Sequence, residues 1–118
     1  MKSYNFQELK VWQRSMILVE ETYKIINHLP SAERFALADQ IRRCAVSVPS
    51  NIAEGQKRLS NKETIQFTSI ALGSLGELQT QLMLCKRIYK IETDVLVDEC
   101  EQITKMLSTL VRSIRTRI

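Results

Sequence analysis

The 118-residue sequence has few of the residues that interrupt regular structure, with only 3 glycines and 2 prolines. An all-β fold needs frequent turns rich in glycine and proline, so this scarcity favours helices. The length matches a single domain of roughly 100–150 residues and is too short for a multidomain enzyme. We therefore predict one all-α domain over residues 1–118.

Long hydrophobic runs are also missing from the sequence. No apolar stretch approaches the ~18–20 residues of a membrane span, and the first eight residues lack the apolar core of a signal peptide. We therefore expect a cytoplasmic location. The three cysteines, Cys44, Cys85 and Cys100, are odd in number and lie in apolar helical patterns. We interpret them as reduced core residues, without a disulfide or a metal.

Sequence motifs for catalysis are scarce as well. The one histidine, His28, lies two residues before a proline, and we expect it to occupy a helix C-terminus. The sequence has no Cys-x-x-Cys, no phosphate-binding glycine loop and no Glu-x-x-His pair. We therefore predict no catalytic residue, no metal and no cofactor. An enzyme that uses Asn51 and Glu54 is an alternative, weakened because no nucleophile or histidine lies near them in the sequence.

Hydrophobic periodicity divides the chain into four helices, because apolar residues recur three or four positions apart. Short connections between such helices predict an antiparallel, up-down-up-down four-helix bundle. The expected stripes run over 9–26, 38–52, 75–89 and 96–114. The expected helix caps are Asn5 with Glu8, Ser31, Ser60 with Glu63, and Thr93 or Asp94.

The first helix carries two apolar lines on different faces. We assign the line that includes Leu9, Met16 and Tyr23 to the core. The second line lies more than ~100° away around the helix, so one core cannot cover both. It predicts a homo-oligomer interface, although scattered surface aliphatics would give the same pattern. The interface candidates are Val11, Leu18 and Ile25.

The third helix has a line of small residues away from its leucine stripe. Small side chains at helical spacing allow a neighbouring backbone to come close, which can offset the ~1 kcal/mol that a glycine costs in a helix. We therefore expect close packing along this line. Its members are Ser69, Gly73, Gly76 and Thr80.

The second helix is expected to continue through Pro49 with a kink, because its apolar stripe is unbroken there. Nearby polar side chains can satisfy the freed backbone groups. They also belong to a polar line that we expect to face outward, and Ser47, Ser50 and Glu54 of this line are candidates for binding a partner protein.

Basic residues concentrate around the second helix, within a chain of net charge +4. Cations flanking a helix and its following turn could contact a phosphate backbone, or they could pair with neighbouring carboxylates. The candidates are Arg42, Arg43, Lys57, Arg58 and Lys62. A second group, Arg112, Arg115 and Arg117, ends the fourth helix, where cations also complement the helix dipole.

Four segments closely resemble the bacterial four-helix bundle family that includes proteins encoded in intervening sequences of 23S ribosomal RNA genes. These segments are Phe6–Gln13, Gln40–Gly55, Ser60–Glu63 and Ala71–Leu78. The resemblance implies a homopentamer of bundles. The related accessory variability protein of diversity-generating retroelements is a pentamer that binds nucleic acid and a reverse transcriptase, so the resemblance also implies such partners.

Together these observations predict a non-enzymatic, homo-oligomeric helical bundle that binds RNA or DNA. Repetition of a weak basic patch by symmetry would strengthen such binding. The alternative is a protein-interaction scaffold that binds no nucleic acid.

Overall fold

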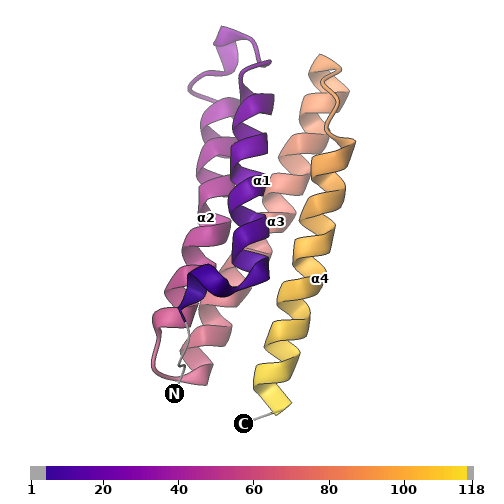
Figure 1. The fold of residues 1–118 in the computed structure, drawn as a ribbon. Helices are drawn as coiled ribbons and strands as arrows, with labels where there is room; N and C mark the ends of the chain where they lie inside the picture. The colour runs from indigo at the N-terminus through magenta and orange to yellow at the C-terminus, as the bar shows by residue number, and fades with distance from the viewer. Residues whose placement is uncertain (1–4, 117–118) are drawn as a thin grey trace.

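The computed structural model describes residues 5–116, which form an elongated bundle of four α-helices, 47 × 21 × 20 Å (Figure 1). The α-helices are α1 (Lys10–Ile26), α2 (Leu37–Lys57), α3 (Asn61–Tyr89) and α4 (Asp94–Thr116). Two short 3-10 helices, η1 (Phe6–Glu8) and η2 (Ser31–Glu33), precede α1 and α2. The prediction of an all-α four-helix bundle is confirmed. None of the described helices combines the length and apolar character needed to cross a membrane.

The helices pack in a ring, in which α1 and α3 each contact both α2 and α4. In Figure 1 the turn between α2 and α3 and the end of α4 lie at the lower end of the bundle, and α1 begins above them in the lower half. We call this lower half the turn end. The other two connections lie at the upper end.

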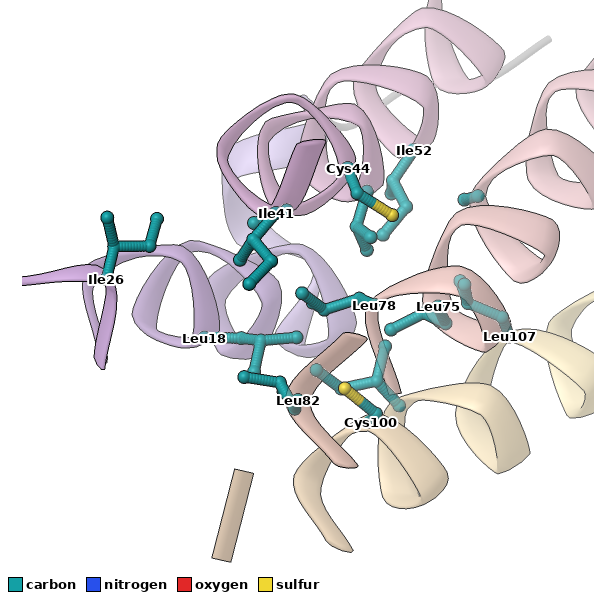
Figure 2. Close-up of a cluster of buried hydrophobic side chains, with 14 of the residues drawn as sticks. Leu18, Ile26, Ile41, Cys44, Ile52, Leu75, Leu78, Leu82, Cys100 and Leu107 are labelled. Carbon is teal, nitrogen blue, oxygen red and sulfur yellow. The ribbon is translucent and has the colours of Figure 1, made fainter. Parts of the chain in front are cut away.

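The core lies along the bundle axis and takes large aliphatic side chains from every helix (Figure 2). Leu18, Ile41, Leu78 and Leu107 represent the four helices, and none is more than 1% exposed. Full burial of such a side chain contributes about 1.5–3 kcal/mol. The predicted stripe of α2 is buried in full, and those of α3 and α4 are buried except for a few half-buried positions.

The line of α1 assigned to the core is confirmed in part, because Ile26 is buried in the core and Leu9, Trp12 and Val19 pack against it. The second line, predicted to be a surface interface, is buried as well. Val11 and Leu18 are buried and Ile25 packs against the core, so these residues hold the chain together and are not a surface interface. Met16 and Tyr23, assigned to the core, are 38% and 40% exposed. The buried face also contains Ser15 and Thr22, which interrupt its apolar pattern and concealed it in the sequence.

The helix starts follow the prediction at α3 and at α4, which begins at Asp94 directly after Thr93. Ser60 Oγ accepts a hydrogen bond from the Glu63 N–H (3.2 Å), as an N-cap does. Asn5 makes no side-chain cap, and Ser31 begins η2 while α2 starts at Leu37. The Glu33 carboxylate accepts instead from the Leu37 N–H (3.3 Å). Glu33 of η2 thus caps the first residue of α2, and the helix begins at Leu37 and not at Ser31.

The line of small residues on α3 is exposed on the surface of the chain. Ser69, Gly73, Gly76 and Thr80 are all exposed, and a Cβ added at either glycine would meet no atom within 4 Å. The expected close packing therefore does not occur between this line and another helix of the same chain. Close approach occurs instead at Gly55, where an added Cβ would lie 3.2 Å from the Thr64 carbonyl oxygen.

Candidate nucleic-acid interface

The turn between α2 and α3 is held by hydrogen bonds that cross it. The Thr64 hydroxyl donates to the Gly55 carbonyl oxygen (2.9 Å), and the Arg58 N–H bonds to the same carbonyl (3.3 Å). Ser60 then caps α3. These hydrogen bonds fix the backbone on both sides of residues 58–60. The Cα positions that carry the charged side chains of this turn are therefore fixed at the end of the bundle.

Three predicted candidates, Lys57, Arg58 and Lys62, lie together at this turn. Lys57 and Lys62 are exposed, and the Lys57 ammonium lies 6.0 Å from the centre of the Phe6 ring. The Arg58 guanidinium lies 4.5 Å from the Phe67 ring centre and pairs with Glu54 (2.9 Å). An exposed pair of this kind contributes about 0.3–0.5 kcal/mol, so it leaves Arg58 able to contact an anion.

The other two candidates, Arg42 and Arg43, are distant from the turn. They lie about 22 Å from Lys57 along α2, at ~1.5 Å per residue. Both pair with Asp39, at 3.7 and 3.1 Å. The carboxylate partner that we considered as an alternative in the sequence is thus present. The five predicted contacts therefore do not form one patch.

The structure instead brings a different basic group to the turn end. Arg112 and Arg115 are exposed near the end of α4, and Lys10 is exposed at the start of α1. Arg117 lies outside the described residues. Sequence reasoning attributed these arginines to the helix dipole and overlooked Lys10. Only the bundle shows that residues so distant in the sequence share one end with Lys57 and Lys62.

The polar line proposed for a partner protein is largely engaged within the chain. Ser47 turns toward α3, where its hydroxyl shares a hydrogen bond with the Ser74 hydroxyl (2.8 Å). Asn51 Nδ2 donates to the Ser47 carbonyl oxygen (2.9 Å), near the position where Pro49 interrupts the helix. Glu54 pairs with Arg58. Of Ser47, Ser50 and Glu54, only Ser50 is both exposed and free of a side-chain contact within residues 5–116.

The cysteines are buried and free. Burial raises the pKa of Cys44 to about 11 and that of Cys100 to about 12, and it also raises the pKa of Cys85. The Cys44 thiol donates to the Ser74 carbonyl oxygen (2.9 Å). Thiols with raised pKa values are poor nucleophiles at neutral pH. Within the described part of the chain, no three His, Cys, Asp or Glu side chains are placed to hold a metal ion.

Fold and site together define a four-helix bundle with a group of cations at one end that form no ion pair within residues 5–116. The sequence matches the 23S rRNA-intervening sequence protein family over residues 7–109, and the chain belongs to this family. The family resemblance seen in the sequence is thereby confirmed.

A solved structure is similar over most of the bundle. It is the crystal structure of a protein with unknown function from the S23 ribosomal protein family of Bacteroides thetaiotaomicron, with a TM-score of 0.79 and 23% sequence identity. The match covers 86% of this chain and 97% of that chain. At this identity the likeness shows the fold alone. No curated protein matches the chain.

Proposed function

We propose that this chain is a non-enzymatic, up-down-up-down bundle that assembles with copies of itself and binds RNA or DNA through the cations of its turn end. The membership in a family named for an intervening sequence of ribosomal RNA is consistent with an RNA-associated role. The short connections and the Ser47–Ser74 and Gly55–Thr64 hydrogen bonds between α2 and α3 support the topology.

One arrangement carries the nucleic-acid proposal. Lys10, Lys57, Lys62 and Arg115 come from four different helices to the turn end, and none forms an ion pair within residues 5–116. Elsewhere in the bundle many cations are paired with a carboxylate. These ion pairs are Lys24–Glu21, Arg42–Asp39, Arg43–Asp39, Arg14–Glu99 and Lys86–Asp94.

Uncompensated cations on a face about as wide as the bundle, 21 × 20 Å, suit a phosphate backbone. A DNA strand carries one phosphate per ~3.4 Å of helix axis, so such a face can contact several phosphates. Release of condensed counterions would then supply most of the affinity, and binding would weaken steeply with salt.

The test compares two charge reversals of equal size. Lys57→Glu with Lys62→Glu changes the turn end, and Arg87→Glu with Lys105→Glu changes exposed, unpaired cations elsewhere. Anisotropy of a fluorescent single-stranded RNA, measured over a salt series, reports the affinity. We expect the turn-end variant to bind at least about tenfold more weakly at ~100 mM salt and to show a shallower salt slope. The control should retain most of the affinity.

Two results would overturn this proposal. One is equal weakening by both variants, which would mean that only total charge matters. The other is the absence of binding by the unmodified protein at low salt. Circular dichroism of each variant ensures that lost binding is not lost folding.

The outer face of α3 supports the self-assembly part of the proposal. Gly73, Gly76 and Thr80 form an exposed line of small residues, flanked by Met83 and Leu84, which are 47% and 38% exposed. Helix axes approach more closely where the side chains between them are small. A helix of a second copy could therefore pack here and cover the apolar flanks. Five copies is the number that the family resemblance implies.

Gly76→Arg tests this assembly, because a Cβ at Gly76 meets no atom of its own chain within 4 Å. We expect the variant to remain helical and to elute as a single chain in size-exclusion chromatography with light scattering. Thr109→Arg, at an exposed position of α4, adds the same charge and should keep the oligomer. A single-chain mass for the unmodified protein at micromolar concentration would refute self-assembly.

A further inference from the structure

A groove between α3 and α4 opens on the surface near the turn end. Its accessible volume is about 330 Å³. It is lined by Ser69 and Leu72 of α3 and by Ser108, Val111, Arg112 and Arg115 of α4. Two guanidinium groups and two hydroxyls thus surround a small apolar floor.

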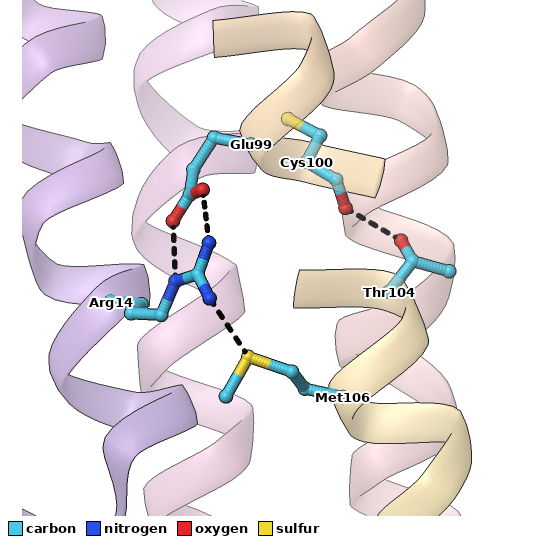
Figure 3. A network of polar contacts seen from close by, with 5 residues as sticks. All are labelled: Arg14, Glu99, Cys100, Thr104 and Met106. Carbon is cyan, nitrogen blue, oxygen red and sulfur yellow. Dashed lines mark hydrogen bonds and ion pairs between the residues drawn. The ribbon is translucent and has the colours of Figure 1, made fainter. Parts of the chain in front are cut away.

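The two serine hydroxyls of the groove are free. Threonines on the same helices donate to the carbonyl oxygen four residues earlier, as Thr104 does to Cys100 (2.8 Å; Figure 3) and Thr80 does to Gly76 (2.9 Å). Ser69 and Ser108 make no side-chain hydrogen bond within residues 5–116. Both hydroxyls can therefore donate to a ligand in the groove.

The two arginines of the groove also have no partner for their charge among the described residues. Arg112 and Arg115 form no ion pair within the described part of the chain, unlike Arg14, Arg42, Arg43 and Arg58. The groove walls contain no acidic residue that could take this role, because the sequence has no Asp or Glu between Glu63 and Glu77 or after Glu101. Within residues 5–116, no carboxylate balances the positive charge of the groove.

The groove lies in line with the turn between α2 and α3. Hydrogen bonds join Thr93 to the Leu82 carbonyl and Gln79 to the Val97 carbonyl, which sets the register between α3 and α4. Continued along the helices, this register puts Ser69 level with Ser108. Lys62 lies on the same face as Ser69, two turns or about 10 Å closer to the end of the bundle.

From this geometry we infer that the α3–α4 groove holds a phosphate of a nucleic-acid backbone, with Arg112 and Arg115 as the charged contacts and Ser69 and Ser108 as hydroxyl donors. Arginine and serine donors of this kind commonly contact phosphate oxygens. This inference rests on the proposed function. It extends that function by giving the phosphodiester chain a path from the turn, past Lys62, into the groove.

Charge reversal tests the arginines. Arg112→Glu with Arg115→Glu should weaken binding of single-stranded RNA and make the slope of log affinity against log salt shallower by about 0.7, since the groove holds one phosphate and each phosphate contact contributes ~0.7 for single strands. A DNA oligonucleotide of the same base sequence should lose affinity to the same degree, because the shared chemistry is the phosphodiester. The control is again Arg87→Glu with Lys105→Glu.

Filling the groove tests its shape without changing charge. Ser69→Phe places a bulky side chain in the groove from an exposed position, and Gln66→Phe places the same side chain on an exposed part of α3 that does not line the groove. We expect weaker binding from Ser69→Phe and little change from Gln66→Phe. Polyglutamate, an anion without phosphates, should compete poorly.

The outcomes separate the two proposals. If the Lys57/Lys62 reversal weakens binding and the Arg112/Arg115 reversal and Ser69→Phe do not, the groove is overturned and the turn-end function stands. If the unmodified protein binds neither RNA nor DNA at low salt, the function fails and the groove fails with it. If polyglutamate competes as well as RNA, the site recognises charge alone and the phosphate contact is refuted.

Discussion

Arg14 of α1 and Glu99 of α4 form a two-pronged ion pair, with Nε–Oε2 and Nη2–Oε1 distances of 2.9 and 2.5 Å (Figure 3). The guanidinium also contacts the Met106 sulfur (3.5 Å), so it spans more than one turn of α4. The pair raises the pKa of Arg14, chiefly through the hydrogen bonds that Arg14 donates to the Glu99 carboxylate. It joins the first and last helices of the bundle, which no connecting loop holds together.

A double-mutant cycle of Arg14→Ala and Glu99→Gln should give a coupling free energy of about 1 kcal/mol, near the top of the range for partly exposed pairs. Urea unfolding followed by circular dichroism measures it. The exposed pair of Lys24 with Glu21 is the comparison and should give at most about 0.5 kcal/mol. Equal coupling in both cycles would contradict a special role for the link between α1 and α4.

Two glycine-to-alanine changes should have opposite effects on stability. Gly55→Ala puts a Cβ within 3.2 Å of Thr64 O and Phe67 Cβ, so the helices must move apart, at a cost of about 1–3 kcal/mol. Within one chain Gly73→Ala meets open space, so in the single-chain Gly76→Arg variant it should stabilise the helix by about 0.5–1 kcal/mol. Urea unfolding of both changes in the Gly76→Arg background checks them, and destabilisation by Gly73→Ala there would contradict the open space beside Gly73.

These glycines show why the sequence predicted the helices well and their faces less well. Helical spacing and apolar periodicity depend on local sequence, and they correctly defined four helices and the buried stripe of α2. Whether a small residue marks close packing depends on which helix comes near, and Gly73 and Gly55 cannot be distinguished by pattern. The same limit hid the second buried line of α1, since Ser15 and Thr22 are buried between its apolar residues.

The candidate site was predictable only in part for a related reason. Lys57, Arg58 and Lys62 are close in sequence and stay close in space because a short turn joins their helices. Arg112 and Arg115 reach the same end only through the packing of α4, which local sequence does not specify. Arg42 and Arg43 lie in the same helix as Lys57. Because the helix rises ~1.5 Å per residue, it places both arginines far from the turn.

The cysteines make stability sensitive to alkaline pH. Unfolded thiols ionise near their ordinary pKa of 9.0, whereas burial holds Cys44 protonated to about 11 and Cys100 to about 12. Between pH 9 and 12 the folded state binds more protons, so the free energy of unfolding should fall as pH rises. Chemical denaturation across this range measures the slope.

Replacing Cys44 and Cys100 by alanine should make that slope shallower, whatever the change in stability at pH 7. Arg14, Lys24, Lys86 and Tyr89 also have raised pKa values and contribute to the remaining slope. An unchanged slope would contradict the contribution of the thiols. At pH 8 the folded protein should react slowly with a thiol reagent, and it should react fully once unfolded.

Ser47 and Ser50 provide a matched pair on α2 that separates structural from partner-binding roles. Ser47→Ala removes the hydrogen bond with the Ser74 hydroxyl and one from Asn51, and it should cost about 1–2 kcal/mol of stability. Ser50 is exposed, and Ser50→Ala should change stability by less than about 0.5 kcal/mol. Because both changes remove one hydroxyl from the same helix, their difference in urea unfolding measures the two hydrogen bonds of the Ser47 hydroxyl, with Ser74 of α3 and from Asn51. Equal, small effects would mean that the Ser47 hydroxyl makes no stabilising contact with α3 and faces outward, as the sequence predicts.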